Sequence, residues 1–270
     1  KVLLDNNKLH EIEEYYEECA NLGANEHQID ESKKAMANME NILGDPKRIK
    51  ALAKDFVEHY EARVSEGATL KGKAIFVSSS RPIAYALFKE IIALRPQWNE
   101  KRICDENVEL SEKEKKKILP LEKLKMIMTR NKDDEKELYN LLGTKEYRKT
   151  LDTQFKNEKS NFKIAIVVDM WLTGFDVPCL DTIYIDKPIQ QHNLIQTISR
   201  VNRKYANKDK GLVVDYIGIK TAMNKALKQF SKIDGQNFED IQASIVVVKD
   251  HLDLLAKLFH RFDSRLYFNG

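Results

Sequence analysis

Five short apolar runs rich in β-branched residues constrain the fold of this chain most strongly. Their length and composition are typical of strands buried on both faces of a parallel sheet. The segments between them have helical spacing, and strands that alternate with helices predict a parallel sheet with right-handed crossovers. The sequence therefore predicts an α/β fold with strands at residues 73–77, 123–128, 163–168, 182–185 and 211–215.

The charge is distributed unevenly along the 270 residues. Of the net charge of +3, residues 1–66 contribute −6 and the remainder +9. A basic α/β part suits contact with nucleic acid, although a surplus of this size is also ordinary surface chemistry. Three widely spaced cysteines, Cys19, Cys104 and Cys179, argue against a disulfide framework or a zinc site and fit a reducing cytoplasm. No stretch approaches the ~20 apolar residues of a membrane span.

The run from Gln191 to Arg203 has the spacing of an amphipathic helix. At about 100° per residue, four long polar side chains share an arc of about 80°: His192, Gln196, Arg200 and Arg203. Arginine suits a phosphate because its planar guanidinium donates two hydrogen bonds at once and stays charged. Two arginines on one helix therefore suit the stabilisation of charge that develops on a γ-phosphoryl group. A solvent-exposed helix with salt-bridging arginines is the alternative interpretation.

A polar loop, Asp169–Pro178, follows the predicted strand 163–168. Gly174 can adopt backbone angles that are closed to other residues, and Pro178 prevents a helix from continuing. In open α/β sheets, ligands bind at loops that follow the carboxyl ends of strands. The order of strand, polar loop, strand, polar loop and arginine-bearing helix resembles the second RecA-like lobe of superfamily 2 helicases and translocases.

The resemblance extends to two motifs. The loop Thr173-Gly-Phe-Asp-Val-Pro178 resembles the fifth motif of the superfamily, which implies a nucleotide-binding or coupling role for Gly174 and Asp176. Thr173 stands where many members carry arginine, and this departure argues against an RNA-helicase branch.

The sixth motif is similar to Gln196-Thr-Ile-Ser-Arg-Val-Asn-Arg203. In the family, a leading polar residue and two arginines approach the triphosphate, which implies that role for Gln196, Arg200 and Arg203. Asn202 stands where many relatives carry glycine.

The longer string resembles the restriction (R) subunit of type I restriction-modification enzymes, most strongly over residues 70–235. This resemblance is carried by residues 173–188, 192–196, 199–203 and 211–218. It implies a RecA-like parallel sheet flanked by helices, forming the second motor lobe over residues 67–235. A helical linker segment over residues 1–66 would precede this lobe, and a C-terminal helical region would begin over residues 236–270.

Two strand-end loops suggest contacts with DNA. Ser78, Ser79, Ser80 and Arg81 offer hydroxyls and backbone N–H groups at the start of a helix, where a phosphate is favoured. Thr129 and Arg130 lie at a neighbouring strand end, and in the family the equivalent loops grip the phosphates of the tracked strand. Such contacts carry no sequence information, as a translocase requires. The alternatives are a plain helix cap for the serines and a surface turn for Thr129 and Arg130.

The sequence contains no G-x-x-x-x-G-K-[ST] phosphate loop and no metal-ligand spacing. We therefore expect ATP and Mg²⁺ to be bound mainly by a first lobe that this sequence lacks. The chain starts at Lys1 without methionine, which suggests a piece of a longer polypeptide. Alone, it is expected neither to hydrolyse ATP nor to cut DNA.

The resemblance also implies partners and a location. The expected partners are double-stranded DNA, a first motor lobe and a nuclease domain of the same polypeptide, and separate methylation and specificity subunits. The expected location is a bacterial or archaeal cytoplasm. Two other hypotheses remain: the second lobe of another superfamily 2 DNA helicase or remodelling ATPase, and a non-catalytic nucleic-acid-binding module of the same fold.

Overall fold

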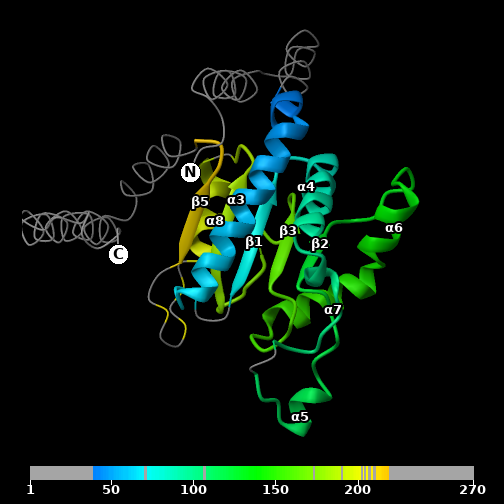
Figure 1. Cartoon of the computed structure of the whole chain (residues 1–270), viewed down its shortest axis with the longest axis vertical. Coiled ribbons are helices and arrows are strands. Elements are labelled where there is room, and N and C mark those ends of the chain that lie inside the picture. Colours follow the sequence, from blue (N-terminus) through cyan, green and yellow to red (C-terminus); the bar gives the residue numbers. More distant parts are fainter. Residues whose placement is uncertain are drawn as a thin grey trace, which may run out of the picture. The chain divides into compact units, whose positions relative to one another are not determined.

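The computed structural model of the protein contains a five-stranded parallel sheet flanked by helices (Figure 1). It describes residues 39–69, 72–105, 108–172, 174–189, 191–201 and 211–218, together with residues 203, 205 and 208, and only the backbone of residues 191–195. The chain divides into the units Lys1–Thr221 and Ala222–Gly270. The helical segments predicted before residue 39 and after residue 218, including 236–270, lie outside the described residues.

Every predicted strand is confirmed, with ends that differ from the prediction by no more than two residues. The neighbouring strands are parallel, in the order β2-β3-β1-β4-β5. All residues of the first four strands are buried, as expected for a sheet covered on both faces. The strands are β1 (Lys73–Ser78), β2 (Leu124–Ile127), β3 (Ile164–Val167), β4 (Leu180–Asp186) and β5 (Leu212–Asp215).

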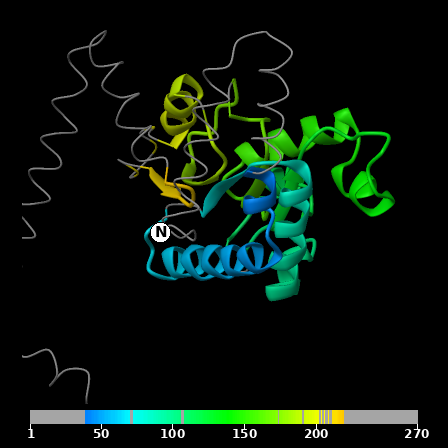
Figure 2. The ribbon, with the colours of Figure 1, turned by 90° about the horizontal axis from the view of Figure 1, so that it is seen from above.

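Helices cover both faces of this sheet. Figure 2 shows α3 and α4 on one side and α8 on the other, where α8 packs against β4 and β5. The described helices are α3 (Pro46–Ser65), α4 (Arg81–Leu94), α5 (Glu112–Lys115), α6 (Lys136–Leu142), α7 (Lys145–Lys156) and α8 (Gln191–Val201), with a 3₁₀ turn η1 (Pro96–Asn99). The predicted α/β class, a parallel sheet flanked by helices, is thus confirmed.

Helix α3 packs directly on the sheet, although its residues belong to the predicted linker segment 1–66. Asp45 caps the start of α3, because its side chain accepts a hydrogen bond from the Arg48 backbone N–H (2.9 Å). Pro46 follows in the first turn, a position that suits proline. The ring of Phe56 meets those of Phe76 and Tyr184 edge-on, with centroids 5.3 and 4.7 Å apart. This part of the segment therefore shares the core of the α/β unit, and a linking role for residues 1–66 stays a prediction.

A buried ion pair fastens α3 to the end of β4. The Arg48 guanidinium donates to both carboxylate oxygens of Asp186, with an Nη1–Oδ2 distance of 3.1 Å, and to the Leu43 carbonyl at 3.1 Å. Burial raises the pKa of Asp186, and the hydrogen bond and charge of Arg48 oppose that rise. This pair fixes the carboxyl end of β4, where the segment leading to α8 begins.

Candidate functional site

The residues singled out from the sequence gather at the carboxyl ends of four adjacent strands. Because the strands are parallel, the segments that follow β2, β3, β1 and β4 all emerge at the same edge of the sheet. These segments contain the predicted DNA-binding residues, after β1 and β2, and the predicted nucleotide-side loop, after β3. Helix α8 follows β4 and completes the group.

The loop after β3 is shaped by two residues with left-handed backbone angles. Trp171 has φ 69° and Gly174 has φ 70°, and a non-glycine residue in this region is uncommon. The Trp171 ring stacks on that of Phe175, with centroids 4.0 Å apart and planes within 14° of parallel, and it also contacts Phe155. The aromatic stack anchors the loop from within, and Gly174 and Asp176 are left exposed.

The structure brings Asp176 and Arg203 together in an ion pair. Arg203 Nη1 lies 2.7 Å from Asp176 Oδ2, and the two side chains are 45% and 51% exposed. This ion pair agrees in part with the alternative interpretation, in which the arginines of this segment form salt bridges. Its acidic partner nevertheless belongs to the strand-end loop, so Arg203 lies at the carboxyl edge of the sheet.

The other predicted residues of the helix differ in exposure. Val201 and Thr197 are buried, which confirms that α8 packs by one side. Arg200 and Gln196 are partly buried, and Arg200 Nε is buried with no hydrogen-bond partner among the described residues. The side chain of His192 lies outside the described part of the structure.

A lysine that sequence reasoning did not single out connects β4 to β3. Lys187 directly follows β4, and its ammonium donates to the Val168 carbonyl (3.2 Å) and forms an ion pair with Asp169. The ammonium thus joins the strand ends that carry the candidate nucleotide-side residues. Lys187 could have been identified from the sequence by its position immediately after a buried strand, the same signal that identified the other strand-end residues.

The serines after β1 present hydroxyls without protein partners. Ser78 is the last residue of β1 and fully buried, whereas Ser79 and Ser80 are partly exposed. Ser80 occupies the N-cap position of α4, yet its side chain caps no backbone N–H group. The three hydroxyl oxygens are buried and accept or donate no hydrogen bond among the described residues. The helix-cap interpretation therefore holds for the position of Ser80 and not for its hydroxyl.

Arg81 links the two predicted DNA-binding loops. Its guanidinium donates to the Thr129 carbonyl after β2 and forms an ion pair with Asp134. Thr129 is exposed, and the Arg130 guanidinium lies 4.2 Å from the centre of the Tyr139 ring, a cation–π arrangement. The structure thus places the two loops side by side, with Arg81 engaged by a carboxylate that the sequence did not identify as its partner.

The described residues contain no group of three or more histidine, cysteine or carboxylate side chains placed to hold a metal ion. Within the same residues, no helix has both the length and the apolar surface needed to cross a membrane.

Comparison with known proteins matches this chain to type I restriction enzyme subunits. The family model for "Type I restriction enzyme subunit R domain 3" matches residues 71–218. The HindI type I restriction enzyme endonuclease subunit of Haemophilus influenzae is 37% identical over 82% of this chain, and a type I endonuclease subunit of Staphylococcus aureus strain MRSA252 is 32% identical over 44% of it. These alignments cover 20% and 14% of the relatives, so the chain spans about a fifth of the length of its longest-matching relatives.

Among solved structures, a Vibrio vulnificus fragment described as an HsdR subunit of a type I restriction enzyme aligns at a TM-score of 0.42 with 13% identity. That alignment covers 66% of this chain and 29% of the fragment.

Proposed function

Because this chain belongs to the type I restriction enzyme subunit R domain 3 family, we propose that it forms part of an ATP-dependent DNA-translocating motor. In this proposal the α/β unit is the second RecA-like lobe of an R subunit. The observation that carries it is the ion pair of Asp176 and Arg203, from two separate motifs, at the carboxyl edge of the sheet. Family membership supports the assignment.

On the nucleotide side, the proposed task of this lobe is to supply positive charge. Arg200 and Arg203 would donate to the γ-phosphate of ATP, and the unpartnered Nε of Arg200 fits such an acceptor. ATP would supply a phosphoryl group whose transfer spreads negative charge over its oxygens. The described residues offer no carboxylate cluster for Mg²⁺, so the first lobe would hold the metal and most of the phosphates.

Arg203 must leave Asp176 to take this role. The pair is half exposed, and exposed ion pairs typically contribute about 0–1 kcal/mol, so a triphosphate can replace the carboxylate at little cost. The state of the nucleotide would then be coupled to the loops that face DNA through Asp176, Gly174 and Gln196.

On the DNA side, the hydroxyls of Ser78, Ser79 and Ser80 and the backbone N–H groups at the start of α4 are the proposed phosphate ligands. Thr129 and Arg130 would contact the same backbone from the neighbouring loop. Contacts of this kind position a duplex without reading its sequence, which is what a translocating motor needs.

The remaining parts of the enzyme are also proposals. The nuclease domain and the first lobe would lie elsewhere in the same polypeptide, and methylation and specificity subunits would assemble with it in the cytoplasm. The chain alone would neither hydrolyse ATP nor cleave DNA.

The decisive experiment measures DNA-stimulated ATPase activity of the full-length subunit. Loss of an arginine finger typically reduces the rate by about 10³–10⁵, so Arg200→Ala and Arg203→Ala are each expected to fall into that range. Arg95→Ala is the matched control, because it removes an arginine at the end of α4 that pairs with Glu61 of α3. Its rate should stay near that of the wild type.

Two results would refute the assignment. If both Arg200→Ala and Arg203→Ala retained rates within about threefold of the control, no arginine finger would be present. If the full-length wild-type subunit lacked any DNA-stimulated ATPase, the non-catalytic binding module would be the better interpretation.

A further inference from the structure

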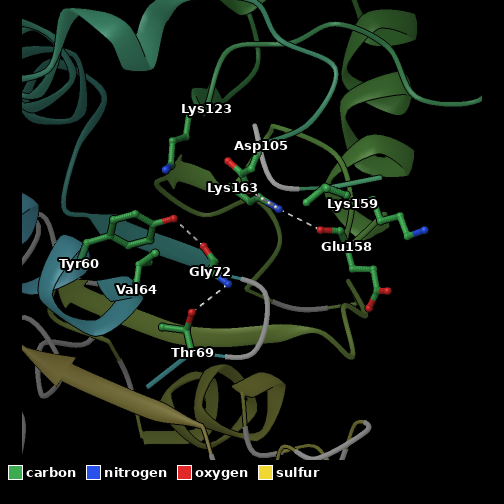
Figure 3. Close-up of a pocket in the computed structure, with 10 residues that line it drawn as sticks. Tyr60, Val64, Thr69, Gly72, Asp105, Lys123, Glu158, Lys159 and Lys163 are labelled. Carbon is green, nitrogen blue, oxygen red and sulfur yellow. Dashed lines mark hydrogen bonds and ion pairs between the residues drawn. The ribbon is translucent and has the colours of Figure 1, made fainter. Parts of the chain in front are cut away.

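The opposite edge of the sheet, at the amino ends of the strands, contains a pocket of about 370 Å³ (Figure 3). It lies between the end of α3, the segment before β1 and the segments before β2 and β3. Tyr60 and Gly72 form one wall, where the Tyr60 hydroxyl donates to the Gly72 carbonyl at 2.8 Å. This pocket is separate from the carboxyl edge to which the proposed motor function belongs.

Three lysines stand in a row at this edge because of the strand register. Lys73 begins β1, while Lys123 and Lys163 come directly before β2 and β3. Backbone hydrogen bonds connect them, from Ala74 N to the Lys163 carbonyl (2.9 Å) and from Lys163 N to the Lys123 carbonyl (3.0 Å). Neighbouring like charges are unfavourable on adjacent strands, so each ammonium group needs compensation.

Two of these lysines have hydrogen-bond acceptors within the protein. Lys163 lies 3.3 Å from the Asp105 carboxylate and donates to the Glu158 carbonyl at 2.9 Å. Lys73 is fully buried and donates to the Phe162 carbonyl at 2.5 Å. The polar partners of both lysines lie within the protein. The Asp105 carboxylate is the negative charge paired with Lys163.

Lys123 differs from both. Its ammonium lies 5.6 Å from the centres of the Tyr60 and Trp98 rings, and the described residues offer it no hydrogen-bond acceptor. Aromatic faces attract a cation but cannot accept its N–H bonds as an oxygen does. Burial lowers the pKa of Lys123, because the charged form has lost water, and the charge of Asp105 opposes this shift.

The composition of the lining points the same way. Among the described residues, three lysines and two carboxylates line the pocket. Lys163 pairs with Asp105, and Lys159 pairs with Glu114 at 2.7 Å, outside the pocket. Lys123, labelled at the pocket in Figure 3, is the lining lysine for which the described residues provide no ion pair.

We propose that this pocket binds a small molecule bearing a phosphate or carboxylate group, which accepts hydrogen bonds from the Lys123 ammonium. The volume is near the lower end of that seen for small-molecule sites, which excludes a large ligand. A bound anion would accept the hydrogen bonds of the Lys123 ammonium, which the aromatic rings cannot do. Its negative charge would also reduce the repulsion among the three lysines.

The test is pulsed acetylation of the 270-residue chain with acetic anhydride over a pH series, at constant ionic strength, with each lysine quantified by mass spectrometry. Inorganic phosphate and acetate are the two probes, and comparison of them separates a phosphate site from a carboxylate site. A bound anion stabilises the ammonium form, so the labelling of Lys123 should slow saturably, by roughly tenfold for each unit by which its pKa rises. Lys54 on the exposed surface of α3 is the internal control and should not respond.

Variants keep the proposal open to refutation. Equilibrium dialysis with labelled phosphate or acetate should show affinity roughly tenfold or more weaker in Lys123→Met and largely retained in Lys123→Arg. Lys54→Met, which removes an exposed charge of α3 outside the pocket, should change the affinity little. Equal protection of Lys54 and Lys123, absence of saturation with both probes, or equal losses in Lys123→Met and Lys54→Met would each overturn the proposal. These readouts do not depend on the ATPase assay.

Discussion

The buried ion pair between Arg48 and Asp186 gives the sharpest test of how the carboxyl edge is held. Asp186→Asn removes the negative charge and leaves a guanidinium that is only 5% exposed. Loss of one partner from a buried pair costs about 3–5 kcal/mol, because the remaining charge is neither paired nor hydrated. Arg48 keeps its bond to the Leu43 carbonyl, so we expect a loss of about 3 kcal/mol in the free energy of unfolding.

Urea unfolding followed by tryptophan fluorescence measures this loss. The unfolding midpoint should fall while the dependence on urea concentration stays unchanged, since the same surface becomes exposed. The double variant Arg48→Met with Asp186→Leu removes both charges and should cost less than the sum of its single variants by about 2 kcal/mol. Glu58→Gln, which breaks the exposed pair with Lys54, is the control and should stay within about 0.5 kcal/mol of the wild type. A loss below about 1 kcal/mol for Asp186→Asn would refute the buried-pair argument.

Three further predictions concern other parts of the α/β unit. Gly143→Ala should destabilise it by about 1–2 kcal/mol or more in urea unfolding, because Gly143 has φ 65° and a Cβ there would lie 2.1 Å from the Tyr147 ring; an unchanged midpoint would contradict this. Cys179, 2% exposed and with its pKa raised by burial, should react with iodoacetamide roughly tenfold or more slowly in the native protein than in urea, as read by mass spectrometry. Hydrogen bonds, first from Lys159, lower the pKa of Glu114 from 4.5 to about 2. The stability that this carboxylate contributes should therefore be present above pH 4.5 and lost as the pH falls toward 2. An NMR titration midpoint near 4.5 would show that the bonds do not form in solution.

The strands could be located from the sequence because a strand buried on both faces is a continuous apolar run, whatever its neighbours are. Their order could not. Strand β2 follows β1 in the chain but lies at the edge of the sheet, and β3 is inserted between them. That order depends on where the crossovers pack, which apolar periodicity does not encode. The packing of α3 on the sheet could not be predicted for a similar reason, since nothing local to residues 46–65 distinguishes a helix on this sheet from one that bridges to another lobe.

The candidate site shows the same division. Helical spacing and the family resemblance placed Arg203 and the loop containing Asp176 at one edge, and the structure brings them together. The partner of Arg81 could not be foreseen, because Asp134 is 53 residues away and reaches it only through the turn after β2. The left-handed angle of Trp171 was equally hidden, since tryptophan has no intrinsic preference for it.

Two of the ion-paired arginines at the carboxyl edge, Arg203 and Arg81, differ in a way that bears on their roles. Arg203 and Asp176 are each about half exposed, so water screens their attraction and a phosphate can take the place of the carboxylate. Arg81 is 24% and Asp134 is 7% exposed, and Arg81 also donates to the Thr129 carbonyl, so releasing it would leave two acceptors less well satisfied. Arg203 is therefore placed to exchange partners, whereas Arg81 holds the loops after β1 and β2 together. A phosphate bound at the serines would then shift both loops as one body.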